Sequence, residues 1–426
     1  MLIYVPIAWV IGNALSIPLL YCLAFYNLLG YITPFTGLVV FTLSCFVAIA
    51  VTVSNKNAVH ISKRHIVLLS VVLLFFFPLI KNSVFSFLIE WDAVAEWFMK
   101  AQSFFYSPGI WGNQLFQNSA FLYTERSYPL GGSLLISVFY RLVGFVNDQT
   151  VQLYLLFFYL NSVILGLGFL NDRIRNISLL SVLLIVLSFF ISPLFIFFSH
   201  NGYMDMVIAN VFISVVVLYI FLLEDKKQRI AQYLIPITLI AGAGMLIKNE
   251  GVPLFILSII FSYLTALFKY KRMKPVAISG TVLIYPLLAK TMWEYYKSAS
   301  NINYYFNPIG FEDIRSRTTL IVSHYLNTLQ YTPTQGVTLI LAFFLLIIFT
   351  TILIAKRQYI TLLPQLLLLL QLGSYTYFYL VTSLPLDIQL PASFDRLVLQ
   401  LLPALFVVLV YQGEKVTKIF SNKQFV

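Results

Sequence analysis

Charged residues are scarce in this sequence, and their scarcity decides the class of protein. They make up 10% of the 426 residues, whereas 60% are hydrophobic and the mean hydropathy is +0.88. A soluble domain carries about 25% charged residues. The composition therefore predicts a polytopic membrane protein, with lipid supplying most of the environment of its helices.

Cysteine is nearly absent too. Cys22 and Cys45 lie in separate apolar runs, which argues against a disulfide framework or a metal knuckle. The sequence has no Gly-rich nucleotide-binding loop and no Asp-x-Asp pair, so it gives no sign of a nucleotide-linked substrate. No basic segment precedes the first apolar run, so we expect a retained span there and not a cleaved signal peptide.

Long apolar runs fill most of the chain, and in a bilayer of about 30 Å they are expected to cross as helices. We predict an all-α polytopic membrane protein of about 11–13 transmembrane helices. It forms a single domain over 1–426, with interfacial helices in two external loops, 81–129 and 294–335. The 13 runs are 6–26, 35–53, 66–80, 130–146, 151–170, 177–199, 206–223, 230–247, 252–268, 276–293, 336–355, 360–382 and 395–412.

The basic residues predict the orientation of these spans. The net charge is +11, and 17 of the 27 Lys and Arg residues fall in the short loops at 54–65, 173–175, 226–229, 269–274 and 356–357 and in the tail. Such a bias marks the cytoplasmic side, and anionic lipid there would add to it. The excess is therefore a topology signal and does not indicate nucleic-acid binding.

This topology leaves one conflict open. Three runs lie between the basic loop at 54–65 and Arg173, and loops on the same side require an even number. Either 130–146 is re-entrant or interfacial, or Arg173 and Arg175 face outward.

The acidic residues gather on the opposite, outer side, where 11 of 16 are expected. Asp92, Glu96 and Lys100 stand four residues apart in loop 81–129 and would share one helix face. Further ionisable residues stand at other helix ends on that side: Asp205, Lys248, Glu250 and Arg396. Ionisable groups at membrane depth usually face a polar cavity or each other, so we expect one shared cavity beneath the loop.

Each residue also has a simpler explanation. Asp92 and Glu96 could form a solvated face paired with Lys100. Asp205 could be a helix cap, and Lys248 and Glu250 could extend to the interface from a helix boundary. Arg396 could be an anchor paired with Asp395. The functional interpretation depends on all of them meeting on one side.

The order of these motifs resembles the GT-C superfamily of integral-membrane glycosyltransferases. The similarity spans roughly 66–412 and is greatest to bacterial relatives of protein O-mannosyltransferases and the lipid A aminoarabinose transferase. The matching motifs are Trp91-Asp92-Ala93, Lys100-Ala101, Tyr128-Pro129-Leu130, Gly202-Tyr203-Met204-Asp205 and Lys248-Asn249-Glu250-Gly251.

The resemblance implies sugar transfer, with inversion, from a polyprenyl-phosphate-linked donor to an acceptor hydroxyl on the outer face of the plasma membrane. The acceptor would be a glycan, a lipid or a protein. Asp92 corresponds to the catalytic base, and Glu96 to a second acid. Lys248 and Arg396 correspond to residues near the donor phosphate. Where family members carry a basic residue before proline, this chain has Tyr128, so that contact would move to Arg126. The substrate-binding candidates are therefore Lys100, Arg126, Tyr128, Asp205, Lys248, Glu250 and Arg396.

No cofactor is required by this chemistry, although oxygen ligands from Glu90, Asp92, Glu96 and Asp205 could hold a Mg²⁺ or Mn²⁺ ion. Two other functions compete. A non-enzymatic flippase for lipid-linked glycans would place charges near the bilayer midplane. An O-antigen-type polymerase or ligase would use arginines in the loops, such as Arg315 and Arg317.

Overall fold

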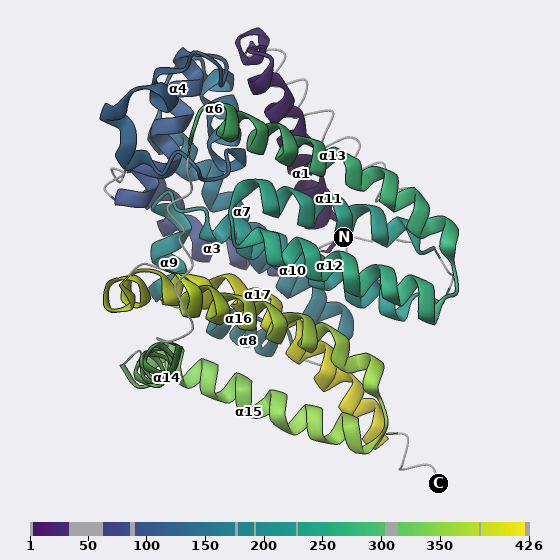
Figure 1. The fold of residues 1–426 in the computed structure, drawn as a ribbon. Helices are drawn as coiled ribbons and strands as arrows, with labels where there is room; N and C mark the ends of the chain where they lie inside the picture. Colours follow the sequence, from purple (N-terminus) through teal and green to yellow (C-terminus); the bar gives the residue numbers. More distant parts are fainter. Residues whose placement is uncertain are drawn as a thin grey trace.

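The computed structural model describes residues 3–33, 63–85, 90–174, 178–190, 193–226, 229–302, 314–331, 333–382 and 385–421. All regular elements within these residues are helices, which confirms the predicted all-α fold. The longer helices run side by side across Figure 1, and short ones gather at one end of them around α4 and α6.

The N-terminal half contains α1 (Tyr4–Phe25), η1 (Leu29–Tyr31), α3 (Lys63–Phe85), η2 (Ala93–Phe98), α4 (Met99–Tyr106), α5 (Gln114–Gln117), η3 (Ser119–Thr124), α6 (Gly131–Val143), α7 (Asp148–Arg173), α8 (Leu179–Phe190) and α9 (Pro193–His200). The C-terminal half contains α10 (Asp205–Glu224), α11 (Ala231–Ile247), α12 (Gly251–Leu264), η4 (Thr265–Lys269), α13 (Met273–Ala299), α14 (Ile314–Tyr331), α15 (Pro333–Ala355), η6 (Tyr359–Leu362), α16 (Leu363–Val381) and α17 (Leu386–Ser421).

Six of these helical segments are long and apolar enough to cross a membrane, and α3, which is bent, makes a seventh if it counts as one span. The six are α1, α7, α10, α12 continued by η4, α13 and α17. The chain is thus a multi-pass membrane protein. The predicted span at 35–53 lies outside the described residues, and the predicted run at 177–199 is divided between the short helices α8 and α9.

Helix α6 resolves the conflict over topology. It has 13 residues and at 1.5 Å per residue it is about 20 Å long, too short to cross the hydrocarbon layer. It packs against α1 and α4. The structure also places Arg173 beside Glu224 at 2.6 Å and Glu414 at 2.9 Å. Arg173 therefore lies at the same end of the bundle as the tail of α17, which agrees with the first alternative.

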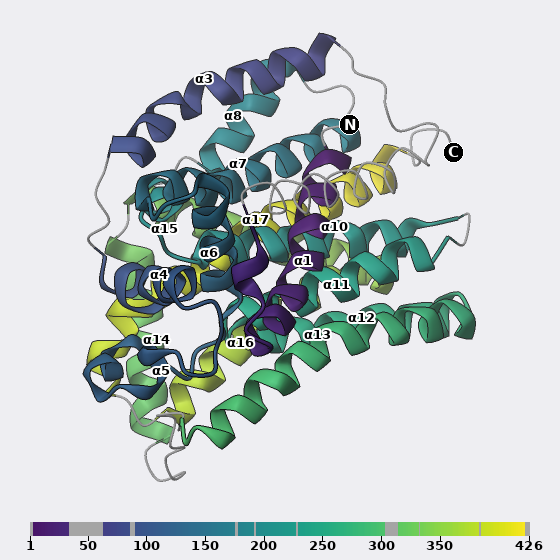
Figure 2. The same cartoon turned by 90° about the horizontal axis from the view of Figure 1, so that it is seen from above.

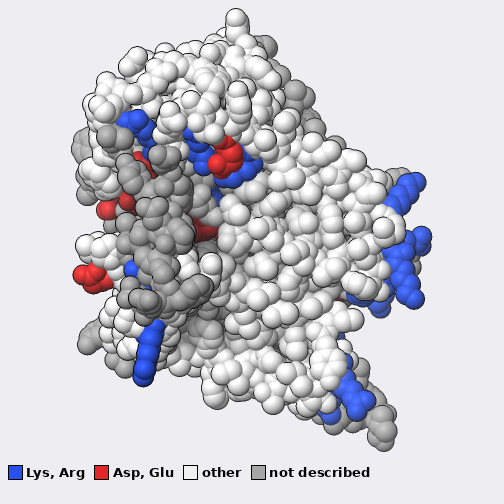
Figure 3. Space-filling model, in the orientation of Figure 1, with Lys and Arg blue, Asp and Glu red and all other residues white. Residues whose placement is uncertain are grey.

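Charge is distributed unevenly along the bundle. On the face seen in Figure 3, basic side chains alone gather at the end where α12 turns into α13, and acidic side chains appear only toward the other end. Figure 2 shows the same two ends from above, with α4 and α5 at the end away from the α12–α13 turn. This separation is the one that the Lys and Arg pattern predicts. Which end faces the cell exterior stays a prediction.

Helix α10 lies at the centre of the bundle. Its side chains are almost all buried, and it packs against α7, α11 and α17. An apolar helix surrounded by other helices is fixed in position and depth. The residues at its N-terminal end, beginning with Asp205, are therefore held rigidly.

Candidate functional site

A cavity of about 1120 Å³ opens beneath the segment 90–129. Its walls come from that segment, from the N-terminal end of α10, from the turn between α11 and α12, and from the facing ends of α16 and α17. These are the helix ends that carry the predicted ionisable residues. The residues that line the cavity and carry its polar chemistry are Asp92, Glu96, Glu125, Tyr128, Tyr203, Lys248, Glu250, Tyr375, Gln389 and Arg396.

The innermost group is Asp205, whose side chain has no exposed surface. It is the first residue of α10, after Gly202, whose φ of +85° makes the sharp entry to the helix. Its carboxylate accepts hydrogen bonds from Lys248 Nζ at 2.9 Å and from Arg396 Nε at 3.1 Å. Gln400 Nε2 donates a third at 2.6 Å. The Asp205 side chain therefore binds two cations and does not cap its helix.

Lys248 and Glu250 are positioned by the tight turn from α11 to α12. A Cβ atom added at Gly251 would lie 2.0 Å from the carbonyl oxygen of Gly244, so only glycine allows the two helices to meet so closely. Lys248 is buried, and its Nζ lies 3.0 Å from Glu250. Burial alone would lower the pKa of Lys248, but Asp205 and Glu250 outweigh burial and raise that pKa above its ordinary value. Lys248 is therefore cationic at neutral pH and does not extend to the interface.

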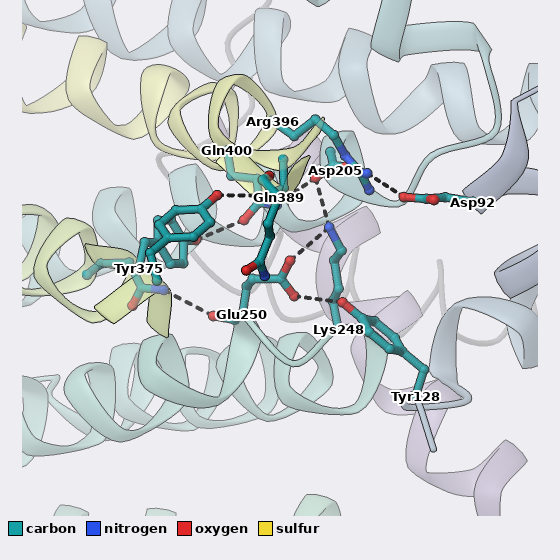
Figure 4. Close-up of polar contacts among 12 residues, drawn as sticks. Asp92, Tyr128, Asp205, Lys248, Glu250, Tyr375, Gln389, Arg396 and Gln400 are labelled. Carbon is teal, nitrogen blue, oxygen red and sulfur yellow. Dashed lines mark hydrogen bonds and ion pairs between the residues drawn. The ribbon is translucent and has the colours of Figure 1, made fainter. Parts of the chain in front are cut away.

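Arg396 of α17 contacts both helix α10 and the segment 90–129. Its guanidinium donates to Asp205 inside and to Asp92 on the cavity side, and it lies 4.3 Å from the centre of the Tyr203 ring. In the part of the chain that the structure describes, Arg396 forms no ion pair with Asp395, the partner that the simpler explanation gave it. Figure 4 shows the resulting chain of alternating charges, in which Arg396 and Lys248 are bridged by Asp205 and flanked by Asp92 and Glu250.

A second set of contacts fixes the outer members of this chain. Tyr128 Oη donates to Glu250 at 3.3 Å, and Gln371 Nε2 donates to the Glu250 carbonyl at 3.0 Å. Tyr375 Oη donates to Gln400 Oε1 at 2.8 Å. The sequence reasoning missed Gln400, Tyr375 and Gln371. Their spacing in the sequence could have indicated them. Gln400 follows Arg396 by four residues and Tyr375 follows Gln371 by four, so each pair shares a helix face.

Three predicted substrate-binding residues do not line the cavity: the buried Asp205, which reaches it only through Lys248 and Arg396, and the two cations Lys100 and Arg126. Lys100 is fully buried, and its Nζ donates to the carbonyl of Glu125 at 2.7 Å. The guanidinium of Arg126 binds the carbonyls of Phe116 at 3.0 Å and of Asn118. Lys100 and Arg126 both hold the backbone of the segment 90–129. Lys100 keeps Glu125, at φ +40°, in the left-handed region at the edge of the cavity.

Other residues considered in the sequence lie elsewhere. Arg317 donates to the Tyr379 carbonyl at 3.1 Å, and neither it nor Arg315 lines the cavity. No cluster of three or more His, Cys, Asp or Glu side chains suited to a metal ion occurs in the part of the chain that the structure describes. Asp92 and Asp205, two of the four candidate ligands, are bound to Arg396.

An apolar groove of about 270 Å³ adjoins this region. It is formed by α14, α15, α16 and α17, and it is lined by Tyr325, Leu339, Phe343, Leu346, Gln365, Leu368, Leu369, Leu372, Phe394, Val398, Leu401, Leu402 and Leu405. Its residues continue those of the cavity along two helices: on α16 the groove residues end at Leu372 and the cavity residues begin at Ser374, and on α17 Val398 of the groove follows Leu397 of the cavity. The polar cavity and the apolar groove therefore share two walls.

In comparisons with known proteins, no protein-family model, no curated protein and no solved structure matches this chain.

Proposed function

We propose that this membrane protein is a glycosyltransferase that moves a sugar from a polyprenyl-phosphate carrier to an acceptor hydroxyl at the outer face of the membrane, with inversion. The observation that carries the proposal is the cavity in which loop carboxylates face two buried cations that Asp205 binds together. A carboxylate can remove the proton of the acceptor hydroxyl, and the cations can stabilise the negative charge of the leaving phosphate. Both groups are present in one cavity, contributed by segments far apart in the sequence.

The carboxylate side is Asp92, with Glu96 nearby. A carboxylate within hydrogen-bond reach of the acceptor hydroxyl takes its proton while the oxygen attacks the anomeric carbon, which contributes about 10²–10⁴-fold to the rate. Asp92 suits this part because its side chain is 26% exposed, which leaves it accessible to an acceptor, and Arg396 orients it.

The phosphate side is the group of Asp205, Lys248 and Arg396. Two cations and one buried acid leave a net charge of +1 in this group, which matches the single charge of a sugar–phosphate–lipid diester. The side chain of Glu250, 19% exposed, and that of Asp92 are the outer partners and can exchange with the phosphate. A cation preorganised in this way stabilises the negative charge that develops as the sugar–oxygen bond breaks.

The apolar groove is a suitable place for the carrier chain. It lies among helices of the bundle and shares α16 and α17 with the cavity. A donor with its phosphate beside Arg396 could extend its hydrocarbon chain along Val398 and Leu402. The groove thus supports a lipid-linked donor over a water-soluble one.

Filling the groove provides a test of this placement. Val398→Trp is expected to raise the KM for a long-chain polyprenyl-phosphate sugar about 10-fold, equivalent to about 1.4 kcal/mol of binding, and to leave the KM for a short-chain analogue unchanged. Ile347→Trp is the matched control, because Ile347 on α15 is 65% exposed and outside the groove. An equal loss with both donors would show that the tail lies elsewhere.

The function itself is tested with the full chain purified into liposomes that contain a membrane lipid extract. We expect mass spectrometry to show conversion of polyprenyl-phosphate sugars to polyprenyl phosphate, together with a glycosylated acceptor. Protein-free liposomes are the control. Movement of an intact sugar-lipid between leaflets, without cleavage, would favour the flippase interpretation and reject the transferase.

A further inference from the structure

Glu96 is a second carboxylate in the cavity that contains Asp92. It lines the cavity from η2, one helical turn after Asp92. Both carboxylates line the same cavity, and the charge of Asp92 acts on Glu96. The turn is a π-helical one, a feature frequent at functional sites.

The two carboxylates have different partners. Asp92 makes a charge-assisted hydrogen bond to Arg396. Glu96 makes no ion pair among the described residues, since Lys100, the cation next along the face, donates to the Glu125 carbonyl instead. Its chain neighbours Ala95 and Trp97 are buried. A partly buried carboxyl without an ion pair binds a proton more readily than one held by a guanidinium.

Four charged side chains act on Glu96: Asp92, Lys100, Lys248 and Arg396. Burial, and then the neighbouring charge of Asp92, raise the pKa of Glu96 to about 7, while Lys100, Lys248 and Arg396 act against this rise. Burial lowers the pKa of Lys100 to about 8, so Lys100 is close to losing its charge in the same range. Glu125 and Tyr128 complete this side of the cavity.

We infer that Glu96 stores the proton that Asp92 removes from the acceptor, so that the two carboxylates work as a proton-transfer pair. The inference rests on the proposed function. The acceptor oxygen forms a bond to the anomeric carbon, the bond from that carbon to the phosphate oxygen breaks with its electron pair leaving on the phosphate, and the hydroxyl proton passes through Asp92 to Glu96. Asp92 then recovers its charge and its contact with Arg396. Two carboxyl groups with separated proton affinities allow this division of roles.

The first test needs no sugar donor. Dicyclohexylcarbodiimide modifies protonated carboxyl groups in apolar surroundings, and peptide mass spectrometry locates the product. We expect modification at Glu96 to be half-maximal near pH 7 and to disappear in Glu96→Gln. In Asp92→Asn the midpoint should move to lower pH, because a negative neighbour is lost. Modification of Glu96 only below about pH 5, the range of an ordinary carboxyl, would overturn the inference.

The second test uses transfer activity and separates this inference from the proposed function. A proton store must be empty before each cycle, so the wild-type kcat/KM should fall as the pH decreases through 7. Glu96→Gln should lower the rate about 10²-fold at pH 8 and remove the inflection near pH 7. A uniform loss with the inflection retained would give Glu96 a structural role and reject the proton store. Absence of transfer in the wild type, despite the labelling pattern, would reject the function and this inference with it.

Discussion

Replacing Asp205 by Asn is expected to destabilise the fold by about 3–5 kcal/mol, the usual cost of removing one partner from a buried ion pair. The side chains of Lys248 and Arg396 are 3% and 12% exposed. Without Asp205 their charges would have to stay buried without their shared inner partner. Unfolding of the full chain in mixed detergent micelles, followed by far-UV circular dichroism, measures the change. Asp172→Asn is the control, because Asp172 is an exposed carboxylate at the opposite end of the bundle.

A double-mutant cycle separates charge imbalance from lost packing. Lys248→Met combined with Asp205→Asn removes one charge of each sign. If imbalance dominates, the double variant should be more stable than the sum of the single changes predicts, by about 0.5–3 kcal/mol. Strict additivity would mean that the two side chains act independently, and the interpretation of Asp205 as the shared anchor would be wrong.

The positions of the site residues followed from topology. Apolar runs joined by alternately basic and acidic loops place the N-terminal end of α10, the α11–α12 turn and the start of α17 at one end of the bundle, whatever their exact packing. Asp205, Lys248, Glu250 and Arg396 each stand at one of these ends, so a meeting of the four could be predicted from the sequence. The likeness to GT-C enzymes stays a prediction, and the proposed activity depends on the experiments above.

Pairings among those residues could not be predicted, since they depend on side-chain direction. The i, i+4 rule suggested that Lys100 would face Glu96, but the π-helical turn and the strained Glu125 place its amine on a backbone carbonyl. Similarly, no pattern in the sequence indicates that Arg396 binds Asp205 in preference to the adjacent Asp395. Helix length was the other limit, because α6 ends at Val143, before Gly144 at φ +89°, whereas the predicted run extends to 146.

Asp92→Asn is expected to reduce sugar transfer by about 10²–10⁴-fold, the contribution of a positioned general base. Asparagine keeps the size of the side chain and can still accept a hydrogen bond from Arg396, but it cannot take a proton. The KM for the donor should not rise, because Lys248 and Arg396 remain bound to Asp205 and the neutral Asn competes less with the phosphate for Arg396. Initial rates with a polyprenyl-phosphate sugar in liposomes give both quantities. Asp387→Asn, an exposed acid near the start of α17 and outside the cavity, is the matched control.

A loss of rate in Asp92→Asn has a second explanation, which Asp92→Glu distinguishes. If Asp92 only holds Arg396 in place, Asn and Glu should both retain part of that contact, and both variants should keep most of the activity. A proton acceptor, in contrast, requires a carboxylate, so Glu should restore activity well above Asn even though its longer side chain shifts the oxygen atoms. Full activity of Asp92→Asn would remove the base from the proposed reaction, and a flippase or a binding protein would then explain the cavity better than a transferase.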